Sequence, residues 1–189
     1  MKALIAVIRW LLKVFFRIEV VGKENIPSEG ACILCLNHIS LFDPLVGYCF
    51  LPRPIRFIGK AELMKVPVVA QVLKAMRVIP VKRGTGDLAA VKASLQTLKD
   101  GEILGIFPTG TREKKNENAP VKAGAALIAT KAGKPVIPIH IIANYRIFSK
   151  VKLVVGPEVD LSEYSGKKLS QDELALAAEK IYSDIKSLG

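Results

Sequence analysis

Short apolar runs alternate with helical patterns along most of this chain, and no other feature restricts its fold as strongly. The apolar runs expected to form strands are residues 31–36, 55–59, 103–107 and 135–143. Helical spacing or helix-ending residues mark stretches between them, such as 43–51, 67–76 and 87–101. This alternation predicts one α/β domain with a mostly parallel central sheet flanked by helices. The length of 189 residues allows a sizeable core.

Capping signals predict where several helices begin. Asp87 is expected to cap a helix whose apolar repeat faces the core. That repeat consists of Leu88, Val91, Leu95 and Leu98. Pro120 favours a helix start, so a helix is predicted over 121–132. Ser170 and Glu173 have the spacing of a capping box and predict a C-terminal helix.

The first 17 residues mix apolar and basic side chains. In a helix, the four cations fall within a sector of about 80° and leave a broad apolar face around Trp10. These cations are Lys2, Arg9, Lys13 and Arg17. The helix is about 26 Å long, shorter than the ~30 Å hydrocarbon core of a bilayer, and charges interrupt it. We therefore expect residues 1–17 to lie in a membrane interface, ahead of a domain over 18–189. The alternative is a helix that covers the domain's own core.

The net charge of +11 predicts an anionic partner but does not identify it. Nucleic acid, anionic lipid and an acidic carrier protein all suit this charge. The sequence contains no aromatic stacking motif of the kind that RNA-recognition domains use, and no basic helix beyond the N-terminal segment. We therefore expect no nucleic-acid partner and favour an anionic membrane surface.

Three cysteines, Cys32, Cys35 and Cys49, include a Cys-x-x-Cys spacing. Residues three apart on a strand point to opposite faces, and no second Cys/His pair completes a set of four ligands. We therefore interpret the thiols as core residues and expect no metal site. An odd cysteine count without a secretory framework is typical of a reducing cytosol.

The apolar run 31–36 ends abruptly at Asn37, which places His38 at the C-terminal end of a predicted buried strand. Open α/β sheets bind ligands at that edge. A tight loop can fold Asp43 back onto His38, and either Ser40 or Asp43 can cap the following helix. In such a pair the carboxylate accepts one imidazole N–H and stabilises the imidazolium, while the other nitrogen takes a proton.

No Gly-x-Ser-x-Gly nucleophile elbow occurs in the chain. If the pair is catalytic, the attacking hydroxyl therefore belongs to the substrate. The alternative is that His38 only satisfies a loop carbonyl. The second histidine, His140, lies in the apolar run 135–143 and is expected to be a hydrogen-bonded structural residue.

Two further strand ends carry groups suited to phosphate. The strand predicted over 77–84 ends in Lys82, Arg83 and a glycine that lets the backbone approach an anion. The strand over 103–107 leads into a small, hydroxyl-rich turn and Arg112, whose guanidinium can bind a phosphate monoester with two parallel hydrogen bonds. Solvated surface charges are the alternative. The polar segment 113–119 is expected to be a mobile loop.

Three sequence blocks resemble those of the glycerolipid acyltransferases, specifically the 1-acyl-glycerol-3-phosphate acyltransferases. They are Asn-His-x-Ser-x-x-Asp at 37–43, Phe-Pro-Thr-Gly-Thr-Arg at 107–112 and Val-Ile-Pro-Ile at 136–139, in the family order. The resemblance covers roughly residues 20 to 160. It implies the glycerolipid acyltransferase fold, and transfer of a fatty acyl group to the sn-2 hydroxyl of lysophosphatidic acid, giving phosphatidic acid. The donor would be a thioester, acyl-carrier protein or acyl-CoA, and no cofactor or metal is needed.

The resemblance also implies roles for individual residues. His38 would be the general base and Asp43 would orient it. Lys60, in a Lys-Ala-Glu-Leu element, would bind the substrate phosphate together with Arg83 and Arg112. The substrate-binding turn would be shaped by Gly110 and Thr111.

One position departs from the family pattern, because Thr109 stands where the family has Glu. Thr109 can hydrogen-bond a hydroxyl but supplies no negative charge. Two alternatives therefore stay open, an acyltransferase for another lysolipid and a catalytically idle membrane-binding module. In each case we expect the protein on the cytoplasmic face of the cell membrane.

Overall fold

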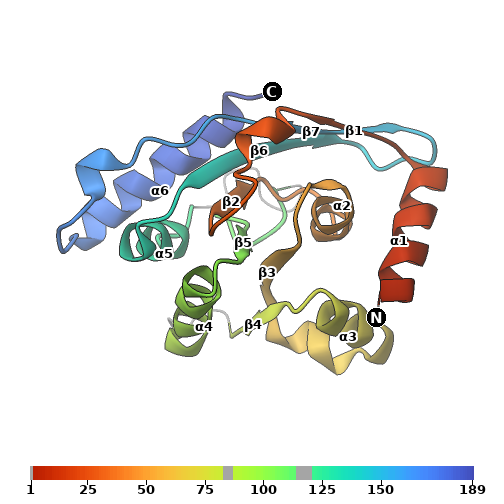
Figure 1. Cartoon of the computed structure of the whole chain (residues 1–189), viewed down its shortest axis with the longest axis horizontal. Coiled ribbons are helices and arrows are strands. Elements are labelled where there is room, and N and C mark those ends of the chain that lie inside the picture. The colour runs from red at the N-terminus through yellow and green to blue at the C-terminus, as the bar shows by residue number, and fades with distance from the viewer. Residues whose placement is uncertain (1, 83–86, 114–120) are drawn as a thin grey trace.

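The computed structural model describes residues 2–82, 87–113 and 121–189 (Figure 1). Its sheet has seven strands in the order β1-β7-β6-β2-β5-β3-β4. The strands are β1 (Arg17–Val21), β2 (Ile33–Leu36), β3 (Ile55–Lys60), β4 (Ile79–Val81), β5 (Ile103–Ile106), β6 (Val136–Ala143) and β7 (Lys150–Val155). All neighbouring pairs in this sheet are parallel except β6 with β7. The predicted α/β class with a mostly parallel sheet is confirmed.

Helices cover both faces of the sheet (Figure 1). The α-helices are α1 (Lys2–Phe15), α2 (Asp43–Phe50), α3 (Pro67–Ala75), α4 (Leu88–Lys99), α5 (Gly124–Ala132) and α6 (Gln171–Lys186). Short 3-10 helices are η1 (Lys23–Asn25), η2 (Ala61–Lys65) and η4 (Ser162–Tyr164). One core cluster joins α1, α2 and α3 to the sheet, and the other joins α4, α5 and α6 to its opposite face.

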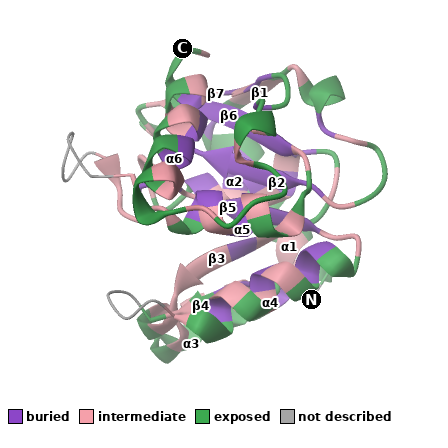
Figure 2. Ribbon diagram, turned by 90° about the vertical axis from the view of Figure 1, so that its left-hand side faces the viewer, coloured by how far each residue is buried: buried purple, intermediate pink, exposed green. Residues whose placement is uncertain are grey.

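The central strands are buried on both faces, as parallel strands between two helix layers must be (Figure 2). Cys32 lies in one core cluster and Cys35 in the other, so the predicted opposite orientation is confirmed. Burial raises the pKa of the Cys35 thiol to about 12, which keeps it protonated. Because β2, β3, β4 and β5 are parallel, the residues that follow them gather at one edge of the sheet.

Two expectations about the helices are wrong in part. Asp87 does cap α4, because its carboxylate accepts the Ala90 N–H at 3.0 Å. However, Leu88 is 81% exposed, and the buried residues of α4 are Ala90, Ser94, Thr97 and Leu98. The small side chains on this face let the helix lie close to its neighbours. Leu88 of the predicted repeat is not part of this face and stays exposed. The helix predicted over 121–132 begins only at Gly124, and Pro120 lies outside the described residues. The capping box of Ser170 and Glu173 is confirmed.

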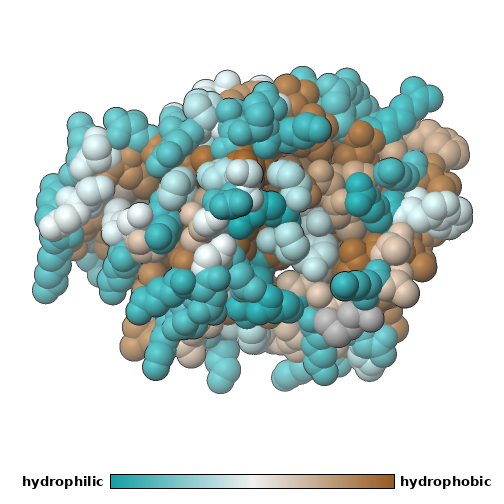
Figure 3. All heavy atoms as spheres, in the orientation of Figure 1, coloured by the Kyte–Doolittle hydropathy of each residue, from teal (hydrophilic) through white to brown (hydrophobic). Residues whose placement is uncertain are grey.

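Helix α1 has one face against the domain and another face exposed. Leu12 is buried in the core, and Ile5 and Ile8 pack against the same cluster. The exposed apolar side chains are Val7, Trp10, Leu11, Val14 and Phe15. Figure 3 shows hydrophobic side chains along the right-hand edge of the molecule, where α1 lies. Part of the helix therefore does cover the domain's own core, and its membrane contact stays a prediction. In the described ranges, every helix is too short or too polar to cross a bilayer.

Candidate active site

The loop after β2 folds Asp43 back onto His38, as the spacing predicted. His38 Nδ1 lies 2.8 Å from Asp43 Oδ2. The same oxygen accepts the backbone N–H groups of Ile39 and Ser40, each at 2.7 Å. Asp43 Oδ1 accepts the hydroxyl proton of Tyr145 at 2.7 Å. The fully buried carboxylate is thus satisfied by four hydrogen bonds, three on one oxygen and one on the other.

The predicted helix start at Asp43 is confirmed, but the expectation that the side chain of Ser40 or Asp43 caps this helix is wrong. Phe42 is the residue at the N-cap of α2, it makes no side-chain cap, and Asp43 is the first helical residue. The Asp43 carboxylate instead points back to the preceding loop, and the Ser40 hydroxyl accepts the Phe42 N–H at 3.3 Å. The side chain that would cap the helix is used to hold His38.

Aromatic rings fix the plane of the imidazole. The His38 ring stacks on Phe107 with centroids 4.3 Å apart, and Phe107 stacks on Phe57 at 5.5 Å. Gly105 makes room for this arrangement, since a Cβ there would come within 2.5 Å of the Phe57 ring. Because Asp43 accepts from Nδ1, a neutral ring keeps its proton on that nitrogen and Nε2 is left as the basic nitrogen.

The backbone of His38 is also clamped, by a residue that we expected in a mobile loop. Glu113 donates its N–H to the His38 carbonyl at 2.7 Å, and its carboxylate accepts the His38 N–H at 3.2 Å. The other carboxylate oxygen lies 4.0 Å from Lys186 Nζ. Burial, with Glu113 beside it, raises the pKa of Tyr182 to about 12. Glu113 is therefore fixed, while residues 114–120 lie outside the described part of the chain.

Asn37 joins the end of β2 to β6. Its side-chain amide donates to the Ile141 carbonyl at 3.0 Å, and its side-chain oxygen accepts the Ile141 N–H at 2.6 Å. This buried pair holds the strand end from which His38 projects. The sequence marked Asn37 only as the point where polarity begins.

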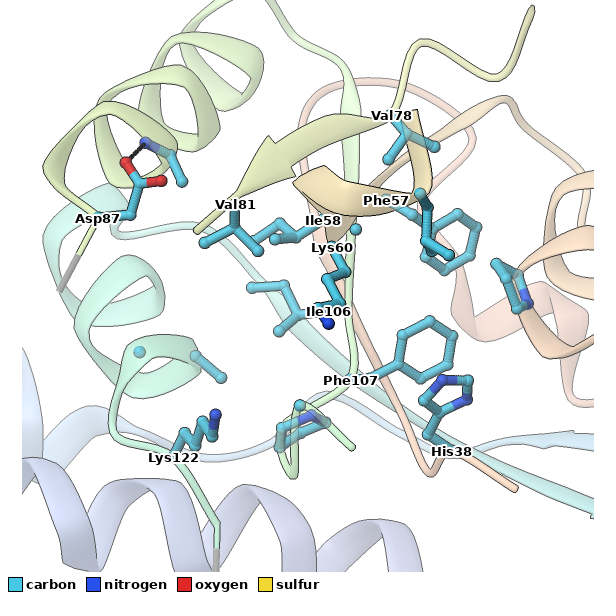
Figure 4. A pocket seen from close by; sticks show the side chains of 18 of the residues that line it. His38, Phe57, Ile58, Lys60, Val78, Val81, Asp87, Ile106, Phe107 and Lys122 are labelled. Atoms are coloured by element: carbon cyan, nitrogen blue, oxygen red, sulfur yellow. Dashed lines mark hydrogen bonds between the residues drawn. The ribbon is translucent and has the colours of Figure 1, made fainter. Parts of the chain in front are cut away.

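His38 lines a cavity of about 900 Å³ (Figure 4). This volume lies at the upper end of the range for small-molecule sites. Apolar side chains from α2, α3, α4 and α5 form much of the wall, including Leu45, Val72, Leu73, Val91, Leu127 and Ile128. Three lysines, Lys60, Lys82 and Lys122, also line it. A flexible aliphatic chain attached to an anionic group suits such a cavity better than a polar substrate does.

The predicted phosphate-binding residues are only partly brought together. Lys60 ends β3 and lines the cavity, and its Nζ lies 3.6 Å from Glu62. Gly110 lines it too, with a φ of 64° that suits glycine. Thr111 and Arg112, both described, are absent from the lining. Arg83 lies outside the described residues.

Thr109 does not face the cavity as a hydrogen-bonding group. It is 2% exposed, and its hydroxyl donates to the Thr111 carbonyl at 2.8 Å. The one proton of the hydroxyl is therefore used within the turn. The expectation that Thr109 takes the place of the family Glu by bonding a substrate hydroxyl finds no support in this geometry.

Lys122 is a cavity residue that the sequence analysis missed. Its N–H donates to the Pro108 carbonyl at 2.9 Å, which ties the segment before α5 to the turn after β5. Its side chain lies against Gly110, since a Cβ there would be 3.3 Å from Lys122 Nζ. Figure 4 shows Lys60 and Lys122 entering the same cavity from opposite sides. A lysine at the start of a predicted helix gives no local signal of this position.

The prediction of a hydrogen-bonded His140 is wrong. Among the described residues nothing bonds its buried Nδ1. Burial, and then the positive charge of Lys186, lower the pKa of His140 against the opposing charge of Glu113, which favours the neutral ring. Gly189, which follows α6, lies against the ring, because a Cβ there would be 2.8 Å from His140 Nδ1.

Comparisons with known proteins identify the family of this chain. A family model described as Acyltransferase matches residues 17–142. The 1-acyl-sn-glycerol-3-phosphate acyltransferase of Bacillus subtilis (strain 168) is 30% identical over 177 residues, covering 90% of this chain and 87% of that relative. The protein of the same name from Borreliella burgdorferi is 31% identical over 198 residues, covering 96% of this chain and 78% of that relative.

A solved structure shares the fold. The crystal structure of the 1-acyl-sn-glycerophosphate (LPA) acyltransferase PlsC from Thermotoga maritima matches with a TM-score of 0.70 and 26% identity. The match covers 99% of this chain and 79% of the Thermotoga chain. The predicted family is confirmed: this chain belongs to the acyltransferase family, among the 1-acyl-sn-glycerol-3-phosphate acyltransferases.

Proposed function

We propose that this protein transfers a fatty acyl group from a thioester donor to the sn-2 hydroxyl of 1-acyl-glycerol-3-phosphate, giving phosphatidic acid. The observation that carries the proposal is the His38–Asp43 pair, 2.8 Å apart, in the wall of a largely apolar cavity with lysines. The names of the relatives support the acceptor. The donor stays open between acyl-carrier protein and acyl-CoA, and no cofactor is required.

His38 acts as a general base in this mechanism. Its Nε2 takes the proton of the sn-2 hydroxyl while that oxygen attacks the thioester carbonyl carbon. The tetrahedral intermediate collapses, the C–S bond breaks, and the departing sulfur receives the proton from His38 as a thiol. Asp43 keeps the ring in the required tautomer and stabilises the imidazolium between the two steps. Holding the hydroxyl beside the thioester supplies a further part of the rate.

Two lysines are proposed to bind the acceptor phosphate. Lys60 and Lys122 both line the cavity, and Lys122 lies against the Gly110 turn. An ammonium group donates up to three charge-assisted hydrogen bonds to a phosphate. Contributions from Arg83 and from Thr111 with Arg112 rest on the family resemblance alone.

The apolar wall is proposed to hold a fatty chain. Each buried CH₂ group contributes about 0.8 kcal/mol, so even part of a chain gives a strong preference for long acyl groups. The cavity, which α3 and α4 line in part, has a volume of about 900 Å³ and so has room for such a chain.

The exposed side chains of α1 support a proposed attachment to the membrane. Its apolar side chains Val7, Trp10, Leu11 and Val14 are exposed, and its cations Lys2, Arg9 and Lys13 are exposed as well. An apolar stripe beside a basic one suits an anionic membrane interface. We propose that the protein binds the cytoplasmic face of the cell membrane in this way, as a peripheral protein.

The test is an acyl-transfer assay with purified protein on mixed anionic vesicles. Lysophosphatidic acid is compared with lysolipids of other head groups, each with acyl-CoA and with acyl-carrier protein. Phosphatidic acid formed by the wild type and lost in His38→Ala supports the proposal. Product only from another lysolipid identifies a different acceptor. No product from any pair of substrates identifies an idle membrane-binding module and overturns the proposal.

A further inference from the structure

The loop between β6 and β7 turns back over the catalytic pair. Tyr145 in this loop has a φ of 51°, and Phe148 has a φ of 62°. Non-glycine residues rarely adopt this left-handed region, so surrounding contacts must hold the loop in place. The Phe148 N–H donates to the Phe15 carbonyl at 2.7 Å, which fixes the loop to the end of α1. The Tyr145 hydroxyl consequently has a defined position.

Two aromatic rings from separate elements fix the Tyr145 ring. Tyr145 meets Phe16 edge to face at 5.5 Å and Phe42 at 5.6 Å, and Phe16 and Phe42 meet each other at 5.7 Å. Phe16 follows α1, and Phe42 precedes α2 at the wall of the cavity. Ring pairs at such separations favour a restricted set of orientations.

The Tyr145 hydroxyl bonds the carboxylate oxygen of Asp43 that the loop after β2 does not bond. Asp43 Oδ2 takes the bonds from His38, Ile39 and Ser40, whereas Oδ1 takes the bond from Tyr145 at 2.7 Å. Burial, and then the negative charge of Asp43, raise the pKa of Tyr145 far above its usual range. The tyrosine therefore stays protonated and donates this hydrogen bond.

We propose that Tyr145 is a positioning residue, which fixes the rotation of the Asp43 carboxylate and through it the orientation of His38. The inference rests on the proposed acyl transfer. Turning the carboxylate about its Cβ–Cγ bond moves both oxygens, so the bond on Oδ1 adds a second restraint to the three bonds on Oδ2. Tyr145 does not line the cavity, so its effect passes through Asp43 and not through contact with the substrate.

The kinetic test is Tyr145→Phe, which removes the hydroxyl and keeps the ring. We expect kcat to fall about 10- to 100-fold while the KM for lysophosphatidic acid changes by less than about twofold. Tyr164→Phe is the matched control, because Tyr164 packs on the other side of the sheet, and it should leave kcat unchanged. A normal kcat for Tyr145→Phe would overturn the proposal, as would a fall explained by lost folded protein.

A double-mutant cycle with Asp43→Asn tests the route of the effect. If Tyr145 acts only through the Asp43 carboxylate, adding Tyr145→Phe to Asp43→Asn should cost no further activity. Full multiplication of the two losses would overturn the proposal.

A measurement without turnover separates this inference from the proposed function. The proton on His38 Nδ1, hydrogen-bonded to a carboxylate, gives a downfield proton NMR signal that His38→Gln assigns. Tyr145→Phe should shift or broaden this signal, and Tyr164→Phe should not. A signal unchanged in Tyr145→Phe overturns the positioning role even if the wild type transfers no acyl group.

Discussion

The acid–base part and the anion-binding part of the cavity are built in opposite ways. The carboxylate of Asp43 is fully buried and bonded on both oxygens, and His38 is held through its ring and its backbone. Lys60, in contrast, has a side chain that is 42% exposed, and Lys122 is exposed. Proton transfer requires one geometry, whereas a phosphate can be met by several lysine rotamers. The contrast indicates a fixed base beside an adaptable anion site.

The largest expected effect comes from removing the fixed base. His38→Ala should lower kcat by about 10³-fold or more, because no other described imidazole lines the cavity. Fold and vesicle binding should be retained, as measured by circular dichroism and co-sedimentation. His140→Leu, which removes the other imidazole, should keep its activity per folded protein. Normal turnover by His38→Ala would show that His38 is not the general base.

A substitution behind the ring stack tests whether rigidity itself matters. Gly105→Ala places a Cβ about where the Phe57 ring lies, so Phe57 and then Phe107 must move. We expect a loss of about 1–3 kcal/mol in the free energy of unfolding. We also expect kcat to fall about tenfold, from displacement of His38. Gly124→Ala, where a Cβ meets no neighbour, is the stability control. Unchanged kcat in a destabilised Gly105→Ala protein would show that the stack is not needed for catalysis.

Substitution of a single lysine in the anion-binding part of the cavity should weaken the binding of lysophosphatidic acid and have a milder effect. Lys60→Gln and Lys122→Gln should each raise the KM for lysophosphatidic acid about 5- to 10-fold, with little change in kcat. Rising salt should reduce the difference from wild type, because it screens exposed charges. Lys131→Gln is the control, since Lys131 lies on α5 but does not line the cavity. A drop in kcat without a change in KM would contradict the proposed role.

The smallest effect is expected at the backbone clamp of His38. Glu113→Ala removes the acceptor for the His38 N–H and should lower kcat about 3- to 5-fold. Glu113→Gln keeps a side-chain oxygen and should restore most of that loss. Steady-state kinetics on the same vesicles measure both variants. Equal losses in the two variants would assign the effect to the charge that faces Lys186.

The His38–Asp43 pair could be predicted because the two residues are close in the sequence. The change from apolar to polar at Asn37 marks the strand end, and a sequence separation of five suffices to bring Asp43 to His38. The alternation of strands and helices likewise predicts the sheet without any long-range information.

Residues placed by distant segments could not be predicted in this way. Tyr145 is 102 residues from Asp43, and Glu113 is 75 residues from His38. Their positions follow from the sheet order and from loop paths, which no local pattern encodes. Leu88 shows the same limit within one helix, because helical spacing does not tell which apolar side faces a neighbour. Lys122 was missed because a lysine at the start of a predicted helix looks like an ordinary surface charge.

The pairing of β1 with β7 determines how late the sheet can be completed during synthesis. β1 is an edge strand of the sheet, and its register runs from Arg17 opposite Lys150 to Val21 opposite Val154. Because its partner β7 lies far along the sequence, β1 must wait until β7 has been synthesised before it can pair. During that interval α1 and its apolar side chains are connected to an unpaired strand. The final place of α1 thus depends on a strand that is made much later than the helix.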